Sequence, residues 1–146
     1  VDLSGADLSG SNMKGTDFTG AKLVGVDLSR SDLTESILEN AEIKNSFLAG
    51  ADIRNANLKN ANLEGTDLSG AKLTKSNFYQ ANLKSANMHR ADLEHANFTE
   101  ANLSQANLSG AKLYDANFSN AILTDADLSG TDQTDTNFSN AKNLKK

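Results

Sequence analysis

The sequence has no cysteine, so it offers neither disulfides nor thiolate metal sites, and it leaves the redox compartment open. It has no apolar run long enough to span a membrane, because alanine and leucine are almost always separated by a polar residue. Proline is also absent, and no Pro/Ser-rich stretch or change of composition marks a linker. We therefore expect one soluble domain over residues 1–146, with no signal peptide visible and the cytoplasm favoured.

What the sequence does contain is a five-residue repeat that runs from Val1 to Lys145 without insertion or deletion. We call each unit a pentad and its positions slots one to five. Slot one is Ala, Ser, Thr or Val in all 29 pentads, and slot three is Leu, Phe, Met or Ile except at Gln133 and Asn143. All 10 glycines fall in slot five. A repeat this complete predicts a solenoid.

The five-residue spacing excludes a helix and favours short strands. Five residues at about 100° each leave successive leucines roughly 140° apart, so a helix would have no apolar face. In a strand, slots one and three point the same way and slot two points the other way. Slots four and five carry turn residues, and glycine in slot five reaches a positive φ most easily. Each pentad therefore predicts a short strand followed by a corner.

The phenylalanines indicate four pentads in each coil. Slot three holds Phe at positions separated only by multiples of twenty, and these form a predicted core stack of Phe18, Phe78, Phe98, Phe118 and Phe138. A square coil of twenty residues would place them on one side of the core, above one another. The chain is long enough for about seven such coils. We interpret the stacked rings as core packing rather than as a ligand site.

The pentads resemble the A(D/N)LXX motif of the pentapeptide repeat proteins. Runs such as ADLSG, ANLKN, ANLEG, ANFTE and ANLSQ carry the resemblance, which covers essentially the whole chain. It implies an all-β fold, a right-handed quadrilateral β-helix, of a kind common in cyanobacteria. The resemblance also implies that acidic members can mimic a DNA duplex and bind type II topoisomerases such as gyrase.

Binding chemistry must come from slots two, four and five, which point outward. We number the four sides of the coil as face 1 (containing Leu3), face 2 (Leu8), face 3 (Met13) and face 4 (Phe18). Their net charges are +1, −2, −3 and −2, with Lys146 left out, so no face has one sign only. The chain's net charge of −5 makes nucleic acid an unexpected partner.

Slot two is usually Asp or Asn, and three apolar exceptions are candidate partner contacts: Ile37, Phe47 and Ile122. Ile37 and Phe47 belong to opposite faces, and Ile122 belongs to a third. Phe47, with Ala49 beside it, is the best single contact candidate. The alternative is that all three are tolerated surface variation.

Catalytic and metal chemistry find little support in the sequence. His89 and His95 fall on adjacent faces of one coil, near Arg90 and Glu94, but in exposed slots without a cleft. No phosphate loop, metal signature or nucleotide motif is present. We expect no cofactor, no resident metal and no enzyme activity.

The two ends of the repeat leave open questions. The pattern begins at Val1 without a starting methionine, so it does not tell whether terminal caps are missing. Gln133 and Asn143 put polar groups into core slots, and Leu144 lies one place out of register, as if folding over the end. An uncovered edge also leaves end-to-end homodimerisation open. The sequence thus predicts a non-catalytic, rod-shaped binding or scaffold module with a protein partner, and the acidic gyrase-binding mimic is the alternative.

Overall fold

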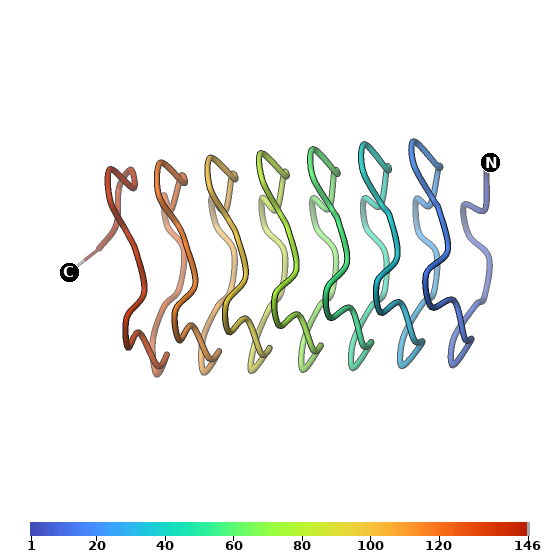
Figure 1. The fold of residues 1–146 in the computed structure, drawn as a ribbon. Helices are drawn as coiled ribbons and strands as arrows, with labels where there is room; N and C mark the ends of the chain where they lie inside the picture. The colour runs from blue at the N-terminus through green and yellow to red at the C-terminus, as the bar shows by residue number, and fades with distance from the viewer. Residues whose placement is uncertain (146) are drawn as a thin grey trace.

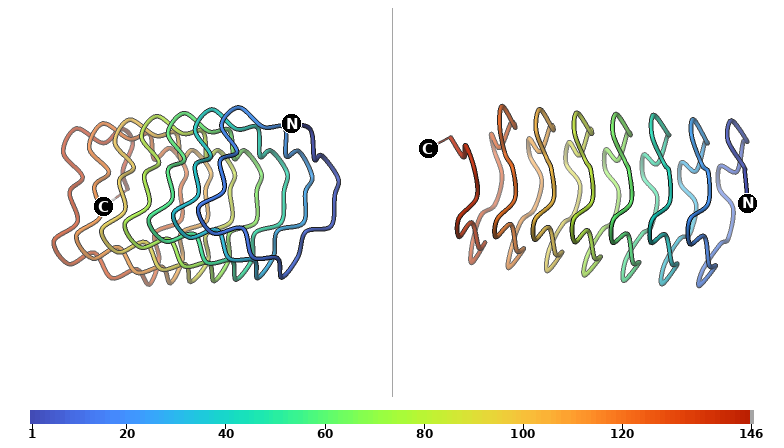
Figure 2. Two further views of the ribbon diagram at one scale, coloured as in Figure 1. Left: turned by 45° about the vertical axis from the view of Figure 1, so that its right-hand side comes forward. Right: turned by 90° about the horizontal axis from the view of Figure 1, so that it is seen from above.

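The computed structural model describes residues 1–145, which wind into a rod of stacked, four-sided coils (Figure 1). Within these residues there is no helix, and each strand is reduced to the slot-two residue of its pentad. Every such residue pairs in parallel with the one twenty positions away. The result is four ladders, running from Asp2 to Lys142, Asp7 to Asp127, Asn12 to Asp132, and Asp17 to Asn137. Figure 2 shows the coils following one another along the rod.

Backbone hydrogen bonds join each coil to the next. N–H groups of slots three and five donate to the following coil, as Phe98 does to the Asn117 carbonyl at 2.7 Å. Slot-two N–H groups donate to the preceding coil, and the slot-one N–H closes the corner, as Ala81 does to the Phe78 carbonyl at 3.0 Å. The predicted period of four pentads is therefore confirmed in the main-chain bonding.

The corners have the same backbone whether or not glycine is present. Slot-five glycines have φ between 64° and 73°, and slot-five residues of other types from Arg30 to Asn140 have φ between 55° and 61°. A positive φ at the third residue of a turn closed by the slot-one N–H is the geometry of a type II turn. Glycine is thus favoured at the corners but not required.

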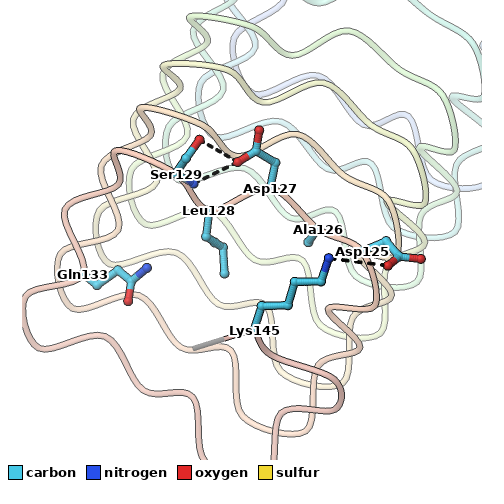
Figure 3. A pocket seen from close by; sticks show the side chains of 7 residues that line it. All are labelled: Asp125, Ala126, Asp127, Leu128, Ser129, Gln133 and Lys145. Carbon is cyan, nitrogen blue, oxygen red and sulfur yellow. Dashed lines mark hydrogen bonds and ion pairs between the residues drawn. The ribbon is translucent and has the colours of Figure 1, made fainter.

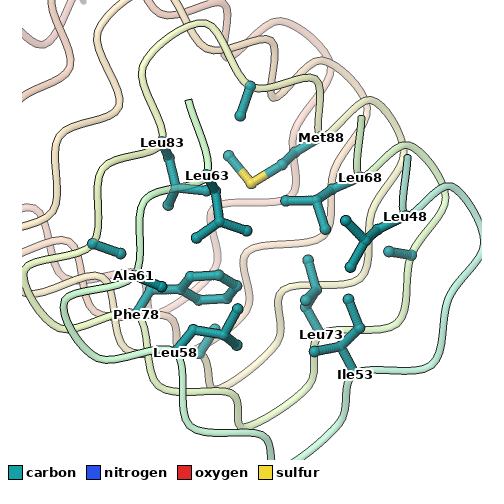
Figure 4. Packing of buried hydrophobic residues seen from close by; sticks show 14 of the residues in the cluster. Leu48, Ile53, Leu58, Ala61, Leu63, Leu68, Leu73, Phe78, Leu83 and Met88 are labelled. Carbon is teal, nitrogen blue, oxygen red and sulfur yellow. The ribbon is translucent and has the colours of Figure 1, made fainter. Parts of the chain in front are cut away.

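Slots one and three fill the interior of the rod. Figure 4 shows leucines, Ile53, Phe78 and Met88 converging from the four sides onto one column. The Phe78 and Phe98 rings stack at 4.8 Å between centroids, and the Phe98 and Phe118 rings at 4.7 Å. Phe138 continues the stack at 5.4 Å, whereas Phe18 is separated from it by Leu38 and Leu58. Alanine in slot one leaves space for only one large side chain per pentad.

Five slot-one serine and threonine residues are buried, and the hydroxyl groups of all but Ser36 donate to main-chain carbonyls. Ser46 donates to the Leu23 carbonyl at 2.6 Å and accepts from the Val26 N–H at 3.2 Å, so it connects two coils. Ser36 differs, because its Oγ is buried and has no hydrogen-bond partner among the described residues. The interior therefore tolerates polar groups where a main-chain carbonyl lies within reach.

The last coil is less tightly enclosed than the middle of the rod. Gln133 and Asn143 are exposed although they occupy core slots, and Leu144 packs partly against the core as the sequence indicated. Asn143 adopts a φ of 60° and donates from Nδ2 to Thr124 Oγ1 at 2.8 Å. Leu144 thus covers part of the apolar column at this end.

Candidate protein-binding surface

A hollow at this last coil has a volume of about 400 Å³ (Figure 3). Its polar groups are already engaged in the bonding of the repeat. Ser129 Oγ donates to Asp127 Oδ1 at 2.6 Å, and Lys145 Nζ lies 3.9 Å from Asp125 Oδ1. The contact between Ser129 and Asp127 recurs in other pentads, as between Ser9 and Asp7 and between Ser29 and Asp27, so it belongs to the repeat and not to this hollow in particular.

The two histidines do not come together. His89 Nδ1 lies 2.8 Å from Ser109 Oγ, and His95 Nδ1 lies 2.8 Å from Asp115 Oδ2. The edge of the Tyr114 ring contacts the His95 ring at 5.4 Å between centroids. Within residues 1–145 no three His, Asp or Glu side chains are grouped to hold a metal ion. The same residues contain no helix with the length and apolar character needed to cross a membrane.

The outward Asp and Asn side chains of slot two have a structural task that the sequence alone did not specify. Each accepts a hydrogen bond from the slot-four N–H of its own pentad, as Asp27 Oδ1 does from Ser29 at 3.0 Å. This bond satisfies the one amide in each pentad that the coil-to-coil bonding leaves over. Hydrogen bonds from the slot-four hydroxyl and then from this N–H lower the pKa of the carboxyls of Asp7, Asp17, Asp32, Asp127 and Asp132, and at Asp2 the N–H has the larger effect.

Asparagines of slot two also bond along the rod. Asn97 Nδ2 donates to Asn77 Oδ1 at 3.3 Å, and Asn77 Nδ2 donates to Asn57 Oδ1 at 3.4 Å. On face 1, Asn82 donates to Asn62 at 3.2 Å. These polar ladders therefore link neighbouring coils through their side chains.

The three apolar exceptions in slot two differ in exposure. The Phe47 side chain is 53 % exposed and Ile37 is 38 % exposed, whereas Ile122 is half buried. Ile122 therefore presents less apolar surface than we expected from its outward slot. Tyr79 is half buried, and its hydrogen bond to the Glu100 carboxylate raises the pKa of the tyrosine hydroxyl.

Among the pentads of face 2, the one that contains Phe47 has the most apolar outward side chains. Its neighbour in slot four is Ala49, where five of the other six pentads of this face have serine. No side chain accepts the Ala49 N–H in the part of the chain that the structure describes, because phenylalanine cannot replace Asp or Asn in that bond. This pentad therefore lacks the slot-two Asp or Asn, the slot-four serine, and the hydrogen bond from the slot-four N–H to the slot-two side chain.

These features define a class of protein: a β-solenoid with four short strands per coil and mainly polar side chains directed outward. The chain belongs to the pentapeptide repeat family, which it matches in 8 copies over residues 2–40, 37–70, 61–100 and 101–140. The predicted right-handed quadrilateral β-helix is confirmed by this membership and by the solved structures that the chain resembles.

Several solved structures are similar to this chain. Trypsin-treated QnrB1, a plasmid-mediated fluoroquinolone resistance protein, is 18 % identical, with a TM-score of 0.59 over 94 % of this chain and 77 % of QnrB1. A pentapeptide repeat protein of the Arabidopsis thaliana thylakoid lumen is 32 % identical over 69 % of this chain and 67 % of its own, with a TM-score of 0.42. HetL, a protein involved in heterocyst differentiation regulation in Nostoc sp. strain PCC 7120, is 30 % identical over 97 % of this chain and 80 % of HetL, with a TM-score of 0.30. No curated protein sequence matches the chain. The QnrB1 likeness shows the fold alone.

Proposed function

We propose that this chain is a non-catalytic, rod-shaped protein-binding or scaffold module that contacts its partner through face 2 around Phe47. The observation that carries the proposal is the 53 % exposure of Phe47 in a slot that holds a turn-forming Asp or Asn in every other pentad of face 2. The substitution loses a hydrogen bond and exposes an aromatic ring, and neither change helps the fold. Exposed aromatic side chains are frequent anchors of protein interfaces.

The chemistry of the other outward groups supports a binding role rather than catalysis. Slot-two carboxylates and amides are bonded to their own turns, and His95 is paired with Asp115 on an open surface. A rigid, flat face suits recognition because its side chains are fixed in position before a partner arrives.

A pair of variants tests the proposal by affinity capture from the native cell. Phe47→Asp restores the usual slot-two residue and its bond to the Ala49 N–H, so the fold should be kept. We expect this variant to lose the captured partner, whereas the matched control Ile37→Asp, on the opposite face, retains it. Equal capture by wild type and Phe47→Asp would contradict a role for this surface.

The second candidate is an acidic DNA mimic that binds a type II topoisomerase such as gyrase. The net charge of −5 favours it. Lysines on face 3 oppose it, because Lys72, Lys75 and Lys112 interrupt the most acidic side. A supercoiling assay with purified gyrase separates the two candidates, since only the DNA mimic is expected to inhibit the enzyme.

A further inference from the structure

The coil register places the Phe47 ring between two carboxylates. Phe47 pairs in parallel with Asp27 on one side and with Asp67 on the other. The Leu28 N–H donates to the Phe47 carbonyl and the Leu48 N–H to the Asp67 carbonyl, both at 2.7 Å. The three side chains therefore project from adjacent coils, about 4.8 Å apart. The Phe47 side chain at the centre of the three is exposed.

Each flanking carboxylate uses one oxygen in its own pentad. Asp27 Oδ1 accepts from the N–H and the Oγ of Ser29, and Asp67 Oδ1 accepts from the Ser69 N–H at 3.0 Å. Among residues 1–145 nothing bonds to Oδ2 of either aspartate. Two carboxylate oxygens thus remain available beside the ring.

The chain's own Arg30 does not fill this place. Its side chain follows the corner of face 2, where its Cγ lies 3.3 Å from the position that a Cβ would take at Gly50. It forms no ion pair within the described residues. Slot four of the Phe47 pentad is Ala49, which has a small apolar side chain and no hydroxyl, so the surface next to the ring is apolar.

We propose that Phe47, Asp27 and Asp67 form a binding site for an arginine side chain of the protein partner. A guanidinium is planar and stacks on an aromatic face, while its N–H fork donates to a neighbouring carboxylate. Lysine is a more strongly hydrated point charge and gains less from the ring. The net negative charge of face 2 favours the approach of a cation. This inference rests on the proposed function, because the arginine belongs to the partner.

An NMR titration of the ¹⁵N-labelled chain with N-acetyl-arginine amide tests the site directly. We expect saturable shifts centred on the amides of residues 27, 47 and 67. The neutral isostere N-acetyl-citrulline amide should bind at least several-fold more weakly. Phe47→Leu keeps an apolar side chain but removes the π face, so it should weaken arginine binding about two- to fivefold.

Conservative charge variants supply the control. Asp27→Asn with Asp67→Asn should weaken arginine binding while keeping the fold, because asparagine makes the same turn bond in Asn87 and Asn107 of this face. Asp7→Asn with Asp127→Asn, on the same face but away from the ring, should leave the binding unchanged. Equal binding of citrulline, equal loss in both double variants, or an absence of shifts at residue 47 would overturn the proposal.

The titration tests the arginine site and the capture experiment tests the protein-binding function, so each proposal can be refuted without the other. Capture that depends on Phe47 without arginine binding would refute the arginine site and leave the protein-binding function intact. Arginine binding at Phe47 together with capture that is insensitive to Phe47→Asp would support the site's chemistry and refute its role in the captured complex.

Discussion

At the residue scale, slot two explains why this chain carries so many Asp and Asn residues. Their side chains satisfy the slot-four N–H, which the ladders leave unbonded, so most of these polar residues serve the fold rather than a ligand. Slot-two residues that cannot accept this hydrogen bond are therefore the better candidates for a role in binding. Phe47 is the most exposed of the three apolar ones, and it stands out because the Asp and Asn residues of this slot have a structural role.

Ser36 and Ser46 should respond oppositely to loss of the hydroxyl. Ser46→Ala removes bonds to the Leu23 carbonyl and the Val26 N–H, and we expect a loss of about 1–3 kcal/mol in the free energy of unfolding. Ser36→Ala removes a buried hydroxyl without a partner, so stability should stay the same or rise. Urea denaturation measures both changes, and equal destabilisation by the two variants would contradict the assigned bonding.

Acid should weaken the fold through the slot-two carboxyls. Hydrogen bonds from slot four lower the pKa of Asp7, Asp17 and Asp132 below the unfolded value of about 3.9. Their contribution to stability is therefore complete above about pH 4 and is lost as the pH falls through the folded pKa values. The melting temperature should decrease in that range.

Changing these three residues to asparagine should make the acid-induced decrease in melting temperature smaller, because the amide keeps the turn bond without titrating. Melting curves between pH 2 and 7 provide the measurement. An unchanged acid response in the triple variant would show that other groups dominate.

At the element scale, each pentad acts as part of a coil and not as a strand of its own. Only one residue in each pentad pairs with a neighbouring coil, so no side of the rod forms an extended β-sheet strand. The four sides are held together by the apolar core that they share. The stacked rings at 4.7 and 4.8 Å show that residues twenty apart share one environment. Stability in such an array depends mainly on contacts between neighbouring coils.

Truncating the column in the middle of the rod should be costly. Leu68→Ala and Phe98→Ala each leave a cavity in a fully buried position, and we expect losses of about 2–5 kcal/mol in unfolding free energy. The exposed change Lys84→Ala should stay within about 0.5 kcal/mol. Chemical denaturation that gave similar values for core and surface variants would refute the inward assignment.

Much of this architecture could be predicted from the sequence, because the repeat is unbroken and the phenylalanines reveal its period. The interior and the corners follow from slots one, three and five. Two features could not be predicted. The half-buried state of Ile122 depends on its neighbours in the coil, and the unsatisfied Ser36 depends on distances to carbonyl groups that no pattern specifies.

The candidate site was only partly predictable. Phe47 stood out because it departs from the Asp or Asn of slot two. Its two flanking carboxylates follow from the twenty-residue period once that period is known. Its exposure and the remaining oxygens of Asp27 and Asp67 required the structure, because both depend on side-chain contacts.

At the scale of the whole molecule, the rod displays side chains at fixed intervals on four flat faces. Function then depends on which side chains become neighbours across coils. If the coil held any number of pentads other than four, Phe47 would not lie between Asp27 and Asp67, and both the binding surface and the arginine site would disappear. The register of face 2 is therefore the central claim.

NMR couplings transmitted through hydrogen bonds measure that register most directly. The structure predicts couplings from the Leu28 N–H to the Phe47 carbonyl and from the Leu48 N–H to the Asp67 carbonyl. Couplings to carbonyls at any other offset along the chain would contradict the four-sided coil and the surface built on it.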